Sequence, residues 1–261
     1  MTELVRVTRT GSIATVLLNR PEAFNAFNFE LTEGFAGQMT SLAADPNIRG
    51  IVISGEGKAF CAGGDLKSAL SFPQGPPAAF HELAGHFHRA ILEIRRMPKP
   101  VIAAINGIAA GGGFSLALAC DFRVIARSAI LRQAYTSSGL CIDGGGSFTL
   151  PRLAGLSRAL EILAFDRPIS SEQAMAWGLV TKVVQDENVI EEATGMAREL
   201  AAGSLASFAW SKKLLTDSFN TSFETHLEQE RRGLCACAAT PEGMEGLKAF
   251  AEKRKPVFTS G

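Results

Sequence analysis

A run of three glycines, Gly111 to Gly113, offers backbone amides for chemistry. It follows a short apolar run, Val101–Ile105, and precedes a compact helical run. Where a strand passes through a glycine loop into a helix, unpaired N–H groups point outward and favour negative charge. The chain has no Lys-Ser/Thr pair after these glycines and no G-x-G-x-x-G motif after the strand, so it lacks both usual phosphate loops. We therefore expect an anion hole for a reaction intermediate.

A second stretch, residues 58–66 (KAFCAGGDL), places small residues directly after another apolar, β-branched run, Ile48–Ser54. Glycine in either stretch, taken alone, is also explained if it merely lets a strand turn into a helix.

The elements that must position these stretches alternate between strands and helices and then become helical only. Residues 4–8 and 13–18 predict a strand hairpin. Further strands are expected at 48–54, 101–105, 122–126, 130–134 and 180–184, and helices at 29–44, 78–96, 147–153, 157–165 and 171–177. Helices alone are expected at 190–201, 205–219, 223–238 and 242–253. This order predicts an α/β core followed by a helical tail.

Composition narrows the class of protein. The 261 residues are 46% apolar and 20% charged, which predicts a soluble globular chain with one sizeable domain or one domain and a helical appendage. Formal charge is zero, and the longest basic run is Lys253-Arg254-Lys255, with pairs such as Arg95-Arg96 elsewhere. Nucleic acid and anionic membrane are therefore not expected partners.

The cysteines and the N-terminus predict a location. Five cysteines at irregular spacing favour reduced thiols and a cytoplasmic protein, and the first ten residues lack a hydrophobic signal core. Cys235 and Cys237 have no second Cys or His pair nearby, so we expect no metal site.

Segments in the same order over nearly the whole chain resemble the crotonase superfamily, which holds the enoyl-CoA hydratases and isomerases. The matching segments are 19–26, 58–66, 100–113, 139–152, 174–180 and 250–254. The resemblance implies an α/β fold, a spiral of ββα units, with residues 1–200 as the core that holds a CoA-thioester site. Residues 201–261 are then a C-terminal helical oligomerisation region of a homotrimer or dimer of trimers. It also implies an acyl-CoA substrate, with coenzyme A entering as part of the thioester and no tightly bound cofactor.

By position, the resemblance assigns two backbone amides, those of Ala62 and Gly112, to the thioester oxygen. A thioester that becomes an enolate gains negative charge on that oxygen, and each preorganised donor is worth roughly 2.7–4 kcal/mol of barrier. The resemblance also implies two glutamates in hydratases, and this chain has Ser115 and Tyr135 in their places. Because neither is a carboxylate base, ordinary hydration of a 2-enoyl-CoA is doubtful.

Asp143 is the remaining carboxylate, in the segment Gly139-Leu140-Cys141-Ile142-Asp143. The resemblance gives this position to the catalytic aspartate of several isomerases. A single carboxylate suffices to move the double bond of a 3-enoyl thioester, since it takes the α-proton and returns a proton at C4. We predict a Δ3,Δ2-enoyl-CoA isomerase on this basis. The alternative role for Asp143 is a cap of the following helix.

Two alternatives use the same residues differently. His88 lies where the hydrolytic aryl-CoA dehalogenases of the superfamily carry a general base, with an aspartate nucleophile at the Asp143 position and a tryptophan where this chain has Tyr135. A solvated or packed histidine is the simpler expectation for His88. The loss of both glutamates also permits a protein that binds acyl-CoA without catalysis.

For the adenosine end of the ligand, the resemblance suggests backbone at two places and three side chains. The backbone contacts are expected at Ala23, Phe24, Ala59 and Phe60. The side chains are Lys67 and, from a neighbouring subunit, Phe250 and Lys253. The acyl pocket is expected to include Phe72, Phe80, Phe87 and Leu140.

Overall fold

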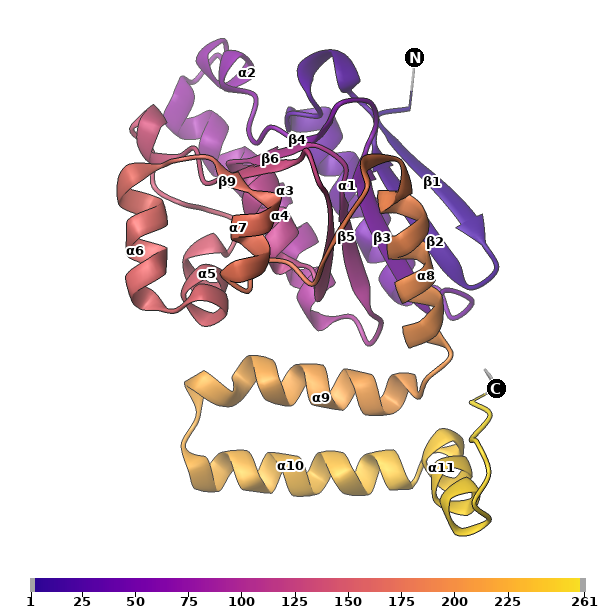
Figure 1. Ribbon diagram of the computed structural model, residues 1–261. Coiled ribbons are helices and arrows are strands. Elements are labelled where there is room, and N and C mark those ends of the chain that lie inside the picture. Colours follow the sequence, from indigo (N-terminus) through magenta and orange to yellow (C-terminus); the bar gives the residue numbers. More distant parts are fainter. Residues whose placement is uncertain (1–2, 259–261) are drawn as a thin grey trace.

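The computed structural model describes residues 3–258, and its core holds two sheets that the chain visits in turn (Figure 1). The larger sheet has the order β1 (Val5–Thr10), β2 (Ile13–Leu18), β3 (Gly50–Gly55), β5 (Val101–Ile105), β7 (Phe122–Ala126) and β10 (Lys182–Val184). The smaller sheet has the order β4 (Ala59–Cys61), β6 (Ile108–Ala110), β8 (Ile130–Arg132) and β9 (Ile169–Ser170). The β1–β2 hairpin is antiparallel, as predicted, and all other neighbours in the larger sheet are parallel.

Successive turns of the chain give one strand to each sheet. β3 is followed by β4, β5 by β6 and β7 by β8, and β4, β6 and β8 pair in parallel with one another. This repetition is the predicted spiral of ββα units. It brings the end of β4 beside the end of β6, although their sequences lie far apart.

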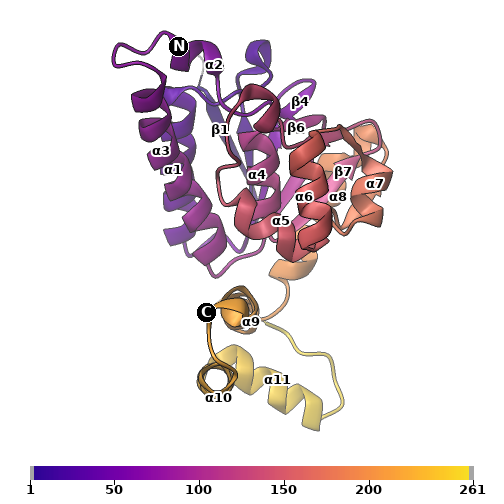
Figure 2. The same ribbon diagram turned by 90° about the vertical axis from the view of Figure 1, so that its left-hand side faces the viewer.

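The larger sheet is covered on both faces, as parallel sheets require. β3 and β5 are buried along their whole length. α8 (Val189–Ala201) packs across β2, β3, β5 and β7. α1 (Phe29–Ala44) and α3 (Pro76–Arg96) pack against each other (Figure 2), and α4 (Gly112–Ala119) is buried at every residue.

The predicted helix pattern follows from caps and apolar spacing. In α1 the Asn28 side chain accepts a hydrogen bond from the Leu31 amide, which satisfies a free donor of the first turn. In α3 the apolar positions Leu83, Phe87, Ile91 and Ile94 are buried at helical spacing, and two prolines stand at its start.

Several elements differ from the prediction. The strand expected to reach residue 134 ends at Arg132, because Ala134 has a φ of 56° and leaves the extended region. The strand expected from residue 180 begins at Lys182. The strands β4, β6 and β9 and the helix α2 (Leu66–Leu70) were not predicted, because two to five residues carry no readable periodicity. α5 (Gly146–Ala154), α6 (Leu156–Phe165) and α7 (Ser171–Ala176) complete the core.

The last three helices lie below the core in Figure 1: α9 (Leu205–Asp217), α10 (Phe223–Ala238) and α11 (Pro241–Ala251). Lys212 ties α9 to the core, since its Nζ donates to Asp121 Oδ2 at 2.8 Å and to the Ile94 carbonyl oxygen at 2.7 Å. The described helices include none long and apolar enough to cross a membrane. Residues 1–2 and 259–261, the outer ends of the two predicted regions, lie outside the described residues.

Candidate active site

The two glycine stretches meet at the adjoining ends of β4 and β6. A Cβ added to Gly63 would lie 2.9 Å from the Ala110 carbonyl oxygen and 3.0 Å from the Gly112 nitrogen. A Cβ added to Gly113 would lie 2.0 Å from the Cys61 carbonyl oxygen. Only hydrogen fits at these positions, because the two main chains are in direct contact. Glycine here is required by a close approach as well as by a turn.

Gly64 and Gly112 each have a free amide at this contact. The Ala62 amide donates to the Phe24 carbonyl oxygen at 3.0 Å, so the prediction that it holds a thioester oxygen is wrong for this structure. Within residues 3–258, no acceptor is within hydrogen-bonding range of the Gly64 or Gly112 amide. Gly112 begins α4, so the positive end of the helix dipole lies at the same place.

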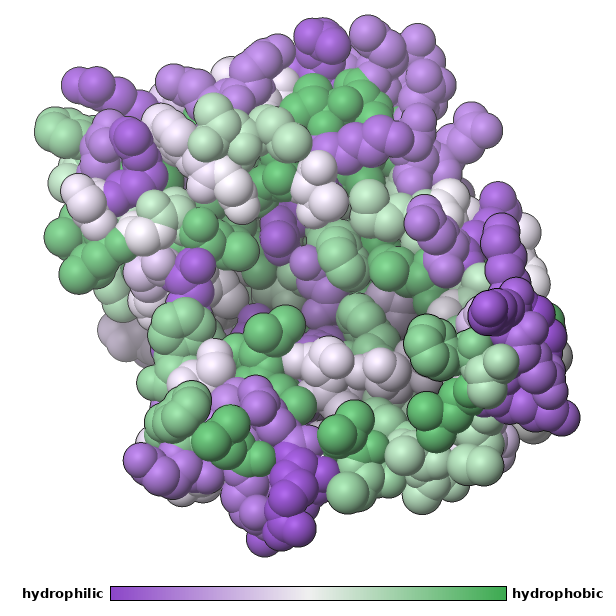
Figure 3. Space-filling model, turned by 60° about the horizontal axis from the view of Figure 1, so that its bottom comes forward, coloured by the Kyte–Doolittle hydropathy of each residue, from purple (hydrophilic) through white to green (hydrophobic). Residues whose placement is uncertain are grey.

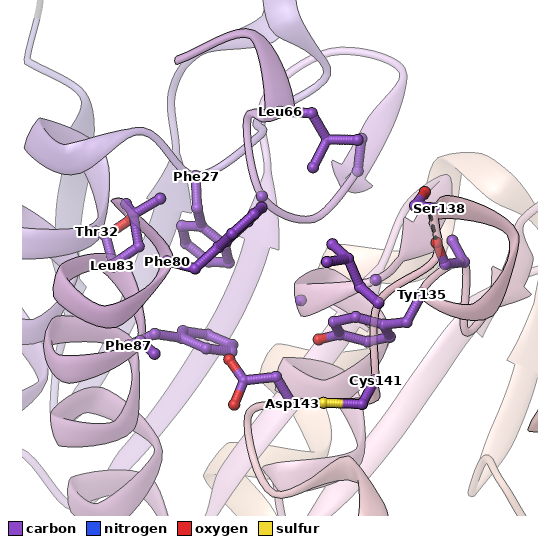
Figure 4. A pocket seen from close by; sticks show the side chains of 17 residues that line it. Phe27, Thr32, Leu66, Phe80, Leu83, Phe87, Tyr135, Ser138, Cys141 and Asp143 are labelled. Carbon is purple, nitrogen blue, oxygen red and sulfur yellow. Dashed lines mark hydrogen bonds between the residues drawn. The ribbon is translucent and has the colours of Figure 1, made fainter. Parts of the chain in front are cut away.

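These glycines form one wall of a cavity of about 380 Å³. Ala62, Gly64, Gly111 and Gly112 line that wall, and the Asp143 side chain lines the same cavity (Figure 4). The apolar lining consists of Phe27, Leu66, Phe80, Leu83, Ala84, Phe87 and Leu140. The Phe27 and Phe87 rings are in contact, with centroids 5.1 Å apart. Phe72 was predicted to line the cavity and does not, because it stacks on Phe29 with centroids 4.9 Å apart.

Asp143 faces the cavity and does not cap the next helix. The N-cap of α5 is Gly145, and no side chain bonds to the amides of its first turn. The carboxylate Oδ1 instead lies 2.6 Å from Nε2 of His88, which α3 carries. The sequence suggested His88 and Asp143 for a shared role only under the hydrolytic alternative, and the fold brings them into contact. Among the described residues that line the cavity, Asp143 is the only carboxylate.

Ser115 and Tyr135 are also neighbours, with the Ser115 Oγ and Tyr135 hydroxyl oxygens 3.3 Å apart. Tyr135 lines the cavity from the loop after β8, and Ser115 lies on the first turn of α4. Burial raises the pKa of Tyr135 well above its ordinary value, so its hydroxyl stays protonated at neutral pH. This pair can donate and accept hydrogen bonds, but it supplies no basic carboxylate.

The residues predicted to bind the adenosine end fall into three groups. Ala59 and Phe60 are only 1% and 0% exposed, so a ligand cannot reach them, and that prediction is wrong. Phe24 is exposed, and its carbonyl group joins it to Ala62 at the cavity edge. Lys67 is exposed on α2.

The structure of a single chain does not test the other residues predicted to bind the adenosine end of the ligand. Ala23 is half-buried in the loop that carries Phe24. Phe250 is 86% exposed at the end of α11, and Lys253 follows it, on the opposite side of the molecule from α2 (Figure 1). Contact between these two residues and a ligand would have to come from another subunit.

Among the cavity residues that sequence reasoning did not assign to the site, two lie next to predicted site residues in the sequence. Gly64 lies inside the predicted glycine stretch, but a motif does not tell which of its amides the fold leaves free. Cys141 is exposed and lines the cavity two residues before Asp143. Its place in the same segment was a usable signal, since a residue beside a catalytic candidate often shares its pocket.

Comparison with known proteins places these features among relatives of similar length. A family model described as enoyl-CoA hydratase/isomerase matches residues 8–261. The chain is 36% identical over 248 residues to the 1,2-epoxyphenylacetyl-CoA isomerase of Escherichia coli (strain K12), covering 95% of each protein.

Two solved structures superimpose closely on the chain. A crystal structure of an enoyl-CoA hydratase from Polaromonas sp. JS666 has a TM-score of 0.92 and 36% identity, covering 98% of this chain and 99% of that one. An enoyl-CoA hydratase from Bacillus anthracis also has a TM-score of 0.92, with 32% identity, covering 99% of this chain and 100% of that one.

Proposed function

The chain belongs to the enoyl-CoA hydratase/isomerase family, and on that basis we propose that it isomerises acyl-CoA thioesters through an enolate. The main support for this proposal is a single cavity that holds both kinds of group. The free amides of Gly64 and Gly112 lie on one wall, and a lone carboxylate, Asp143, lies on another. The proposed reaction is that of a Δ3,Δ2-enoyl-CoA isomerase.

The proposed mechanism follows from where charge develops. The Gly64 and Gly112 amides hold the thioester oxygen, and Asp143 removes the α-proton from C2 of a 3-enoyl thioester. The oxygen then carries the enolate charge, which each amide stabilises by roughly 2.7–4 kcal/mol. The protonated Asp143 returns a proton at C4, which completes the shift of the double bond.

Hydration is disfavoured by the side chains at the Ser115 and Tyr135 positions. Addition of water to a double bond needs a base that takes a proton from the water, and neither a serine nor a protonated tyrosine hydroxyl does this readily. The two hydroxyl oxygens lie within hydrogen-bonding distance of each other, so each can satisfy the other without a carboxylate.

The acyl group is proposed to be apolar and bulky enough to meet aromatic rings. Four large apolar side chains of α2 and α3 line the cavity: Leu66, Phe80, Leu83 and Phe87. The name of the Escherichia coli relative adds ring-bearing thioesters, including ring epoxides, to the substrates worth testing.

The test is turnover of 2-enoyl, 3-enoyl and aromatic acyl-CoAs, with products identified by mass and absorbance. Asp143→Asn should lower turnover of the preferred substrate by roughly 10²–10⁴-fold while acyl-CoA binding persists. Cys141→Ser serves as the matched control, because it alters the same segment without touching the proposed chemistry. A wild-type protein that binds acyl-CoA and turns none over would instead be a non-catalytic binder.

A second candidate function is hydrolytic removal of a halide from an aryl-CoA, which the His88–Asp143 contact favours. In this reaction an Asp143 oxygen attacks the ring carbon, the halide leaves, and an aryl ester forms. Water that gives a proton to His88 then hydrolyses the ester at the carboxyl carbon. In ¹⁸O-labelled water this route leaves label in Asp143 after one turnover, whereas isomerisation leaves none.

Oligomerisation is proposed to complete the CoA site. Apolar surface is spread over the lower part of the molecule, and a hollow separates it from the core (Figure 3). The large exposed apolar side chains of α9–α11 and the adjoining turn include Leu215, Phe219, Phe223, Leu234 and Phe250. Apolar side chains that gather on one surface mark an interaction site. We propose a homotrimer or dimer of trimers, which light scattering distinguishes from a monomer. The free cysteines support a cytoplasmic location.

A further inference from the structure

We propose that His88 is the path by which the Asp143 carboxyl group exchanges its proton with solvent during isomerisation. The inference rests on the proposed isomerase function and deepens it. It assigns His88 a positioning and relay role through Asp143, without contact with the substrate, and it makes a prediction about the origin of the proton at C4.

The two oxygens of Asp143 have different surroundings. Oδ1 lies 2.6 Å from His88 Nε2. Within the described residues, Asp143 has no other side-chain partner, so Oδ2 is the oxygen left for a substrate proton. The Asp143 side chain is 40% exposed, and Phe87 and Leu140 line the same cavity. We infer that a bound acyl group covers the carboxyl group from the cavity side. His88 then remains as the polar group between the carboxyl and water.

His88 lies at the boundary between the cavity wall and solvent. On α3 its neighbour Phe87 is buried and lines the cavity, while the His88 side chain is 49% exposed. Nε2 faces Asp143, and Nδ1 has no hydrogen-bonding partner in the described part of the chain. One ring nitrogen is therefore directed to the carboxyl group and the other is available to water, which is the arrangement of a proton relay.

The relay balances as an exchange of one proton for another. After Asp143 takes the C2 proton, the carboxyl O–H bond breaks and an N–H bond forms at His88 Nε2, leaving carboxylate and imidazolium. The imidazolium gives this proton to water and takes another from solvent. The reverse transfer restores the carboxylic acid, which then protonates C4. Throughout this exchange the dienolate oxygen stays hydrogen-bonded to the Gly64 and Gly112 amides.

The consequence is a solvent-derived hydrogen in the product. With the relay, a 3-enoyl-CoA turned over in D₂O acquires deuterium at C4. Without it, the same proton removed from C2 is returned to C4, and the product retains the hydrogen of the substrate. The two routes differ in isotope content even where their rates are the same.

The experiment compares wild type with two glutamine variants in D₂O, using trans-3-hexenoyl-CoA and mass spectrometry of the product at early conversion. His88→Gln keeps a side-chain amide that can bond to Asp143 but cannot relay a proton. His86→Gln is the matched control, because His86 lies on the same helix and bonds to no described residue. A second substrate, dideuterated at C2 and used in H₂O, tests the same transfer. With the relay the deuterium removed from C2 is lost to solvent, and without the relay it is returned to C4.

We expect deuterium at C4 with wild type and His86→Gln, and loss of that label with His88→Gln, which should still isomerise. Equal labelling by His88→Gln and wild type overturns the relay, since Asp143 then exchanges with water directly. Unlabelled product from wild type also overturns it. Absence of both isomerisation and C2 exchange in wild type overturns the proposed function itself, so the two failures are distinguishable.

Discussion

Two walls of the cavity are built in different ways. One is main chain: residues 61–64 and 111–113, pressed together so closely that side chains cannot enter between them. The other is side chain: Asp143 and Tyr135, with His88 of α3 in contact with Asp143 from the surface, and Asp143 and His88 are partly exposed. The first wall is fixed by the sheets behind it, and the second by contacts between side chains.

The two walls therefore have different roles: the main-chain wall stabilises negative charge on oxygen, and the side-chain wall moves protons. Amides at a strand end and a helix start stabilise a negative oxygen whatever acyl group is attached, because they respond only to charge. The side chains opposite decide where protons go. We infer that the main-chain wall sets the class of substrate, a thioester, and that the side-chain wall selects the reaction.

The largest effect is expected from adding one methyl group inside the main-chain wall. Gly63 has a φ of 100° and space for no Cβ, whereas a Cβ at Gly64 meets nothing within 4 Å. Gly63→Ala should destabilise the fold by on the order of 2–5 kcal/mol, and Gly64→Ala by less than about 0.5 kcal/mol with activity retained. Chemical denaturation measures both. Equal stability of the two variants would contradict the close approach of the two loops.

Removing one N–H without changing a side chain should come next in size. Glycolic acid in place of Gly64 converts its amide to an ester and should lower kcat roughly 10²–10³-fold. Lactic acid in place of Ala62 is the control, because that amide is already bonded to the Phe24 carbonyl oxygen. The control should lose stability but little kcat. The opposite result would return the donor role to Ala62.

The smallest effect is a difference in thiol reactivity between the walls. Cys61 is buried in the main-chain wall, where burial raises its pKa to about 12, and Cys141 is exposed in the cavity. At pH 8, N-ethylmaleimide should modify Cys141 and inhibit turnover, with coenzyme A thioesters protecting it, while Cys61 stays unmodified. Peptide mapping measures this. Inhibition that persists in Cys141→Ser would place the sensitive thiol elsewhere.

Periodicity predicted the long elements, because the apolar residues of an amphipathic helix such as α3 recur at helical spacing, and a buried strand such as β5 is a continuous apolar run. It missed β4 and β6, which are three residues each and yet position both glycine stretches. The family pattern pointed to Asp143 by type and spacing.

Contacts between distant segments were beyond the sequence. His88 and Asp143 are 55 positions apart, and only folding shows that they meet. The choice between Ala62 and Gly64 depends on the Phe24 carbonyl group, which a separate loop supplies. A motif locates such a site, but the surrounding fold decides which of its amides is free.

The most direct measurement is the infrared stretch of a ¹³C-labelled thioester carbonyl in acyl-CoA bound to the protein. If the Gly64 and Gly112 amides hold the oxygen, the stretch should lie below its frequency in water, and an ester at position 64 or at position 112 should each reverse part of that shift. A bound thioester with the same frequency as in water, or a shift that both ester variants leave unchanged, would contradict the account.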